Sequence, residues 1–144
     1  MLSREDVKKV TVSLTGIHEN SGDEEISDVC EGTLIYREPY YFVTYEEKID
    51  RESRELTKTL LRYNEESLRV TRKGNAVSEL VFVKGKTHKC EYATEMGSFD
   101  IEIITDDFLY EDDGRSTKIE VSYRLGLNGM RPSESHMSLK IERR

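Results

Sequence analysis

Apolar and polar residues alternate along most of this chain. The clearest run lies between Thr117 and Leu127, where every second residue from Ile119 onward is apolar or aromatic. Strict alternation places one set of side chains on each face of a β-strand. The pattern predicts about ten strands, which cover residues 9–17, 26–37, 40–49, 54–63, 68–72, 77–83, 88–94, 99–105, 117–127 and 137–141.

Residues 54–63 fit either a strand or a helix. Leu56, Leu60 and Tyr63 have helical spacing, whereas Thr57 and Thr59 favour a strand. Because the segments on both sides are strands, we expect a strand here.

Turn residues separate the predicted strands. The stretch Tyr92–Gly97 joins two alternating runs through a short polar turn, so it predicts a β-hairpin with Gly97 as the turn residue. Glu38-Pro39 ends the second strand, and Gly32 inside that strand indicates a bulge or a close backbone approach. The acidic stretch 106–114 interrupts the alternation and is interpreted as a connection.

These strands predict an all-β protein with a single domain over residues 1–144. No helix of convincing pattern occurs, so the strands are expected to pair antiparallel through hairpins. A meander of this length leaves long edges unless it closes on itself. We therefore favour an antiparallel up-and-down β-barrel of about 8–10 strands over a Greek-key sandwich.

The amino-acid composition argues against two classes of binding partner. The formal net charge of −7 argues against nucleic acid and against anionic membrane surfaces, which both attract clustered Lys and Arg. The amino terminus has no apolar run typical of a secretory signal, and no apolar stretch is long enough to span a membrane. Two cysteines, Cys30 and Cys90, do not make a disulfide framework. A cytoplasmic protein with free thiols is expected.

A set of short motifs resembles the YwiB-like family of uncharacterised bacterial proteins. In order they are Gly32-Thr-Leu-Ile-Tyr36, Tyr45-Glu-Glu47, Thr57-x-Thr59, Arg72-Lys-Gly74, Tyr92-Ala-Thr-Glu-Met-Gly97, Thr105 and Tyr123-Arg-Leu125. The resemblance covers nearly the whole chain and implies a calycin-like, lipocalin-like barrel. It implies no settled activity and no catalytic residues. The chain has His136 where the family leads us to expect an asparagine.

Polar residues that share the apolar strand faces are the candidate ligand-binding residues. By alternation they are Tyr45, Arg72, His88, Tyr92, Thr94, Thr105 and Tyr123. If the barrel holds a cavity, Arg72 is the natural counter-ion for a carboxylate or phosphate. The alternative is a packed barrel, in which the tyrosine hydroxyls bond the backbone and Arg72 reaches solvent at a barrel end.

The titratable residues do not identify an enzyme or a metal site. His88 and Cys90 share a strand face, but neither further metal ligands nor an orienting group for a nucleophile is evident. The acidic stretch around Asp113 departs from a calcium loop, because Leu109 stands at its first position. We expect no catalytic residues, no metal and no cofactor.

Two functions follow from these patterns. The first is a non-enzymatic barrel that binds a small, partly apolar or anionic ligand in its interior. The second is an interaction module or homodimer without a ligand, which would use the outward aromatic pair Tyr40 and Phe42. Under both hypotheses the protein is a monomer or a homodimer.

Overall fold

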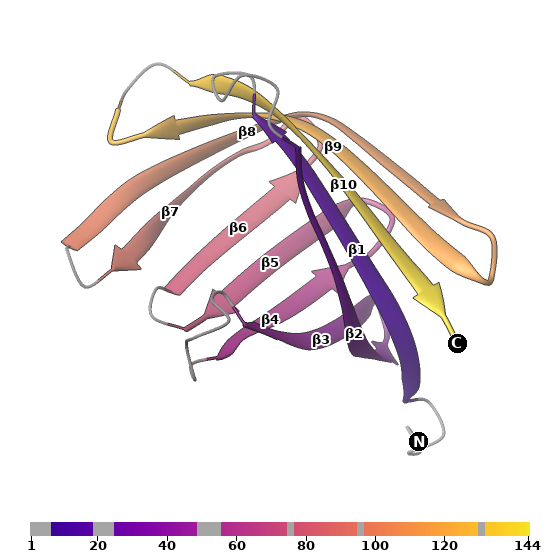
Figure 1. Cartoon of the computed structure of the whole chain (residues 1–144). Coiled ribbons are helices and arrows are strands. Elements are labelled where there is room, and N and C mark those ends of the chain that lie inside the picture. Colours follow the sequence, from indigo (N-terminus) through magenta and orange to yellow (C-terminus); the bar gives the residue numbers. More distant parts are fainter. Residues whose placement is uncertain (1–6, 19–24, 49–55, 75–76, 95–96, 130–131) are drawn as a thin grey trace.

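The computed structural model describes residues 7–18, 25–48, 56–74, 77–94, 97–129 and 132–144. Every regular element in these ranges is a strand (Figure 1). Among them there is no helix long and apolar enough to cross a membrane. The strands are β1 (Lys8–His18), β2 (Glu25–Arg37), β3 (Tyr40–Lys48), β4 (Leu56–Tyr63), β5 (Ser67–Lys73), β6 (Val77–Val83), β7 (Thr87–Thr94), β8 (Gly97–Asp112), β9 (Ser116–Leu127) and β10 (Ser133–Arg143).

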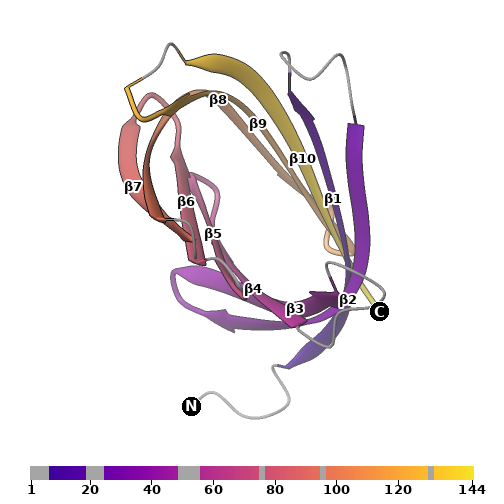
Figure 2. The same cartoon turned by 60° about the vertical axis from the view of Figure 1, so that its left-hand side comes forward.

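The strands form a closed antiparallel barrel. Each strand pairs with its neighbour in the sequence, and β1 pairs with β10 to close the ring. The ring of strands has an elongated, oval outline (Figure 2). The predicted all-β, up-and-down barrel is confirmed.

Two uncertain stretches are strands. The described part of the ambiguous segment, residues 56–63, is β4, which pairs with β3 and β5. The acidic stretch 106–114 is not a connection, and that interpretation is wrong: β8 continues as far as Asp112. A bulge between Thr105 and Asp107 explains the error. One extra residue shifts the side-chain alternation, so that Thr105 and Phe108 are both buried.

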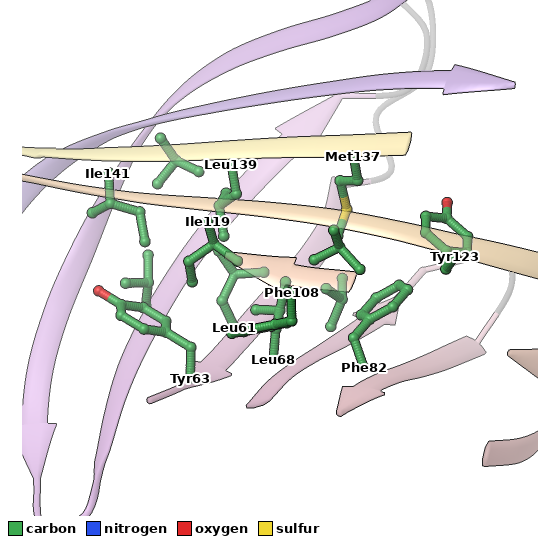
Figure 3. Close-up of a cluster of buried hydrophobic side chains, with 14 of the residues drawn as sticks. Leu61, Tyr63, Leu68, Phe82, Phe108, Ile119, Tyr123, Met137, Leu139 and Ile141 are labelled. Atoms are coloured by element: carbon green, nitrogen blue, oxygen red, sulfur yellow. The ribbon is translucent and has the colours of Figure 1, made fainter. Parts of the chain in front are cut away.

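The hydrophobic core fills the middle of the barrel. Leu61, Leu68 and Phe82 come from β4, β5 and β6. They meet Ile119, Leu139 and Ile141 from β9 and β10 (Figure 3). All six are fully buried, and burying a side chain of this size contributes roughly 1.5–3 kcal/mol. Tyr63 and Tyr123 lie toward opposite ends of this cluster.

Gly32 marks a close approach of two strands. It lies opposite Tyr45 of β3, and a Cβ atom at this position would stand 2.7 Å from the carbonyl oxygen of Thr44. That distance is too short for a real Cβ contact, so only glycine fits without a backbone shift. The prediction of a close backbone approach at Gly32 is confirmed.

Candidate functional site

Arg72 lies on the inner face of β5 toward one end of the barrel. It pairs in register with Thr59 of β4 and Ser78 of β6, and Thr59 in turn pairs with Tyr45 of β3. The four residues form a row across four neighbouring strands. Tyr45 and Thr59 are buried, and Arg72 is half-buried. The alternation in the sequence therefore placed Tyr45 and Arg72 correctly on one inner wall.

Tyr123 faces the barrel interior from the opposite wall. It pairs in register with Thr105 of β8 and Ser135 of β10, and its ring makes an edge contact with Phe82 at 4.9 Å between centroids. Burial raises the pKa of Tyr123, while a hydrogen bond with Ser135 and the positive charge of Arg72 act in the opposite direction. Arg72 and Tyr123, predicted from distant segments, are thus close enough to influence each other.

Several polar atoms on the inner walls are buried without a hydrogen-bond partner among the described residues. They are Thr59 Oγ1, Tyr63 Oη, Arg72 Nε, His88 Nδ1 and Thr105 Oγ1. Arg72 also forms no ion pair within the described ranges. Leaving a buried polar atom unpaired costs about 1–3 kcal/mol, and more when the group is charged. Such atoms are available to bond a small polar ligand.

The remaining sequence-predicted residues lie on β7. His88 and Cys90 pair with the buried Ile103 and Ile101 of β8, which puts them on the inner face. The backbones of Tyr92 and Thr94 end β7 in the predicted hairpin, and Gly97 begins β8 with a φ of 126°. The side chains of Tyr92 and Thr94 lie outside the described part of the molecule, so their role stays a prediction.

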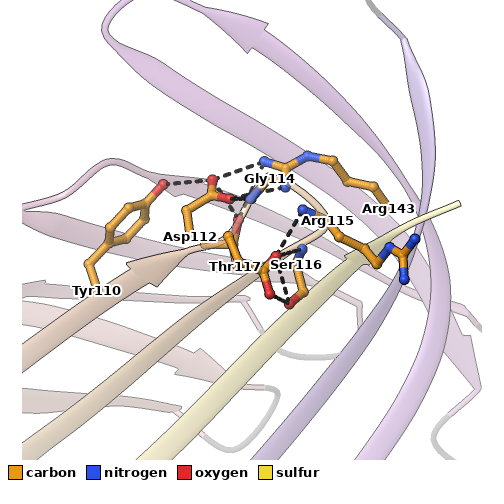
Figure 4. Close-up of polar contacts among 8 residues, drawn as sticks. Tyr110, Asp112, Gly114, Arg115, Ser116, Thr117 and Arg143 are labelled. Atoms are coloured by element: carbon orange, nitrogen blue, oxygen red, sulfur yellow. Dashed lines mark hydrogen bonds and ion pairs between the residues drawn. The ribbon is translucent and has the colours of Figure 1, made fainter.

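A second polar cluster occupies the other end of the barrel. Arg143 of β10 donates two hydrogen bonds to the Asp112 carboxylate, with N–O distances of 3.1 and 3.3 Å (Figure 4). Thr117 and the backbone N–H of Gly114 also donate to that carboxylate, at 3.2 and 2.8 Å. The side chains of Arg143 and Asp112 are only 14% and 21% exposed. The two residues form a bidentate ion pair whose side chains are mostly shielded from solvent, although Asp112 as a whole residue is exposed.

Tyrosines adjoin this ion pair. Burial raises the pKa of Tyr110 to about 12, and the charge of Asp112 adds to the effect. The hydroxyl of Tyr63 lies near Thr117 at a geometry short of a hydrogen bond, and burial raises the pKa of this tyrosine as well. For Asp112 burial also acts to raise the pKa, but the hydrogen bonds from Arg143 and Gly114 outweigh it, and the pKa is lowered.

The sequence pattern missed this second cluster. Asp112 and Tyr110 follow the bulge in β8, where the alternation had been interpreted as a connection. The neighbouring turn is built on local chemistry: Asp113 Oδ1 accepts the backbone N–H groups of Arg115 and Ser116, and Gly114 has a φ of 88°. Counting on from Phe108 in steps of two would have placed Tyr110 and Asp112 inside.

Two hollows lie along the barrel wall, and the larger one shares Tyr45 and Thr59 with the row of residues beside Arg72. The larger, of about 760 Å³, is lined mainly by outward-facing residues of β1 to β5, including Lys9, Thr44 and Lys73. The other, of about 710 Å³, lies over β7, β8 and the start of the β9–β10 connection. Arg72 lines neither of them. No group of three metal-binding side chains exists among the described residues.

The aromatic pair named in the second hypothesis lies on the outer face of β3. The rings of Tyr40 and Phe42 meet edge to face at 6.4 Å, and the Arg62 guanidinium stands 4.6 Å from the centre of the Tyr40 ring. Both rings are half-buried, and Leu60 of β4 is 37% exposed nearby. The outer surface here combines aromatic, aliphatic and cationic side chains.

Comparison with known proteins places the chain in a family. Residues 11–139 match the model of a domain of unknown function, DUF1934. No curated protein matches the chain. Among solved structures, the ywiB protein from Bacillus subtilis is similar at 19% sequence identity, with a TM-score of 0.82 over 96% of this chain and 94% of that one. This likeness shows the fold of the expected YwiB-like barrel, and the family model shows that the chain belongs to the DUF1934 family.

Proposed function

We propose that this barrel binds a small, partly apolar anion in its interior, with Arg72 as the counter-ion. The observation that carries the proposal is that the inward-facing Arg72 has a buried Nε without an acceptor and no ion pair among the described residues, whereas the outward-facing Arg69, whose Nε is also unpartnered, is paired with Glu79. A guanidinium nitrogen that is buried without an acceptor is costly, and a bound carboxylate or sulfonate would remove that cost.

The surroundings of Arg72 suit a ligand of mixed character. Thr59 and Thr105 supply buried hydroxyls without partners, which can donate to or accept from a polar head group. Phe82, Val70 and Ile103 supply buried apolar surface on the same inner walls. One guanidinium balances one negative charge, so a monoanion fits this environment better than a dianion, whose second charge would stay uncompensated.

The proposal is tested with a fluorescent probe that has this character, 8-anilinonaphthalene-1-sulfonate. We expect the wild-type protein to bind the probe and Arg72→Met to bind it at least tenfold more weakly, because a charge-assisted hydrogen bond contributes roughly 1.5–3 kcal/mol. Arg69→Met is the matched control. Arg69 lies on the same strand but faces outward, where it pairs with Glu79 at 2.8 Å.

A second measurement does not depend on the probe. Native mass spectrometry of protein purified from its own host is expected to detect a retained small molecule, and the Arg72→Met variant is expected to lose it. Equal probe binding by wild type and Arg72→Met, together with a mass that corresponds to the bare chain, would contradict the proposal.

A second candidate function uses the outer face of β3. Phe42 lies between Ile35 of β2 and Arg62 of β4 in the strand register, so an apolar and cationic surface continues across three strands. Such a surface suits a second copy of the chain or another protein. Sedimentation of wild type and Phe42→Ser distinguishes the two candidates: a dimer that dissociates in the variant would favour the interaction function.

A further inference from the structure

The barrel wall has a seam between β6 and β7. Among the described residues the two strands share one register pair, Val77 with Ala93. On either side, β6 is paired with β5 from Val77 to Val83, and β7 is paired with β8 from Thr87 to Thr94. The seam therefore lies between two strands that are each firmly held on their far sides. Figure 1 shows β6 and β7 as neighbours in the ring.

The seam is closed at both ends and unpaired in between. At one end the backbone N–H of Lys86 donates to the carbonyl of Val83, which closes the turn. At the other end Val77 pairs with Ala93. Backbone bonds between the turn and Thr105 tie it to β8 instead, with Gly85 donating to Thr105 and Thr105 donating to Lys86. This anchoring holds the turn toward β8, where the bulge in that strand begins.

Inward-facing residues along the seam connect it to the Arg72 site. Leu80 of β6 and Cys90 of β7 are half-buried and pack against the core. Ser78, at the start of β6, is the register partner of Arg72. Burial raises the pKa of Cys90 and the charge of Glu79 on β6 adds to the effect, so the two strands are close enough for their side chains to interact electrostatically. The unpartnered His88 Nδ1 lies on the β7 side.

The described residues leave little open surface at either end of the barrel. Around Arg72, which is itself half-buried, the side chains of Tyr45, Thr57, Thr59, Tyr123 and Ser135 are each at most 7% exposed. From the other end, the Arg143–Asp112 ion pair and the fully buried core side chains stand between solvent and Arg72. The seam is the part of the described wall with the fewest backbone bonds to break.

We infer that the seam between β6 and β7 is the entrance through which the ligand reaches Arg72. The inference rests on the ligand-binding function proposed above. Separation of β6 from β7 breaks the single Val77–Ala93 pairing and the turn bond, whereas separation of any other strand pair breaks a ladder of at least six register pairs. Local opening occurs where a fold has the fewest bonds to break. In the described wall of the barrel, that place is the seam.

The test closes the seam covalently. If the register set by Val77 and Ala93 continues, Val81 lies opposite Lys89, and both side chains face outward. In a Cys30→Ser/Cys90→Ser background, Val81→Cys/Lys89→Cys is crosslinked with a short bifunctional maleimide. The matched control is Lys118→Cys/Lys140→Cys, crosslinked in the same way between β9 and β10, which are already paired at that position.

The readout is the rate of probe binding by stopped-flow fluorescence with 8-anilinonaphthalene-1-sulfonate. Closing the β6–β7 seam is expected to slow association and dissociation by at least tenfold each, while the equilibrium affinity changes less than twofold. The β9–β10 crosslink is expected to change neither rate. Unchanged rates in the protein with the closed seam would overturn the inference that the seam is the entrance. Absence of Arg72-dependent binding in the uncrosslinked protein would overturn the proposed function and the entrance with it.

Hydrogen exchange supplies a readout that needs no ligand. The amides of residues 79–82 and 88–91 that face the seam are expected to exchange at least tenfold faster than the amides that β9 and β10 share. Equal protection of the seam amides and the β9–β10 amides would mean that β6 and β7 are paired in solution. That result would contradict the inferred entrance, whatever the protein binds.

Discussion

The two ends of the barrel each hold an inward-facing arginine, and the two arginines have opposite surroundings. Arg143 is held by both oxygens of Asp112, and Thr117 lies 3.4 Å from its Nη2. Arg72 has a buried Nε without an acceptor, and no described carboxylate pairs with it. Removing one partner from a complete ion pair leaves the other charge uncompensated, whereas the Nε of Arg72 already lacks a described acceptor. Under the proposed function, the Asp112 end is structural and the Arg72 end binds the ligand.

The largest expected effect comes from breaking the ion pair. Arg143→Met leaves the mostly shielded carboxylate of Asp112 without its counter-charge, and we expect the free energy of unfolding to fall by about 2–3 kcal/mol. Urea denaturation at neutral pH measures the change. Arg124→Met is the control, since its pair with Asp106 is exposed to solvent and is expected to contribute much less. Similar losses in both variants would remove the distinction between shielded and exposed pairs.

The stability that the Arg143–Asp112 pair contributes should decrease in acid. The lowered pKa of Asp112 means that the unfolded chain binds a proton before the folded one. Its contribution to stability is therefore present above about pH 4 and is lost as pH falls through the folded pKa, which lies below 3.8. We expect Asp112→Asn to be less stable than wild type by about 1–2 kcal/mol at pH 7. The difference should shrink below pH 3.8, and a constant difference from pH 7 to pH 2.5 would show that the charge contributes nothing.

The Arg72 end should respond in the opposite way. Arg72→Met removes a half-buried guanidinium whose buried Nε lacks a described acceptor, so we expect the free energy of unfolding to stay within about 1 kcal/mol of wild type or to rise. Urea denaturation of the protein freed of bound small molecules measures this. A loss as large as that expected for Arg143→Met would mean that Arg72 is structural, and the comparison between the two ends would fail.

The smallest effect is expected at alkaline pH. Burial raises the pKa of Tyr110 to about 12, so the unfolded chain loses this proton near pH 10 while the folded chain keeps it. Stability is then expected to decline slightly from about pH 10 to pH 12. Difference absorbance at 295 nm for wild type against Tyr110→Phe reports the ionisation. An ordinary tyrosine pKa near 10 would show that this end is open to solvent.

Much of the fold could be predicted because alternation reports which strand face is buried. The inner positions of Tyr45, Thr105 and Tyr123 follow from period two alone, and all three are buried. The same rule failed after the bulge in β8, where one extra residue shifted the parity of Tyr110 and Asp112. The segment 54–63 was ambiguous because Leu60 gives helical spacing, yet Leu60 faces outward and is 37% exposed.

The sequence by itself determined the strands, the hairpin order and the face on which most side chains lie, because these depend on residues that are neighbours along the chain. Only the tertiary structure decided that Arg143 of β10 meets Asp112 of β8 and that Arg72, whose Nε has no described acceptor, lies near Tyr123. It also decided that β6 and β7 share a single pair. These features depend on the register and curvature of a closed ring, in which a shift of one residue changes which charges meet.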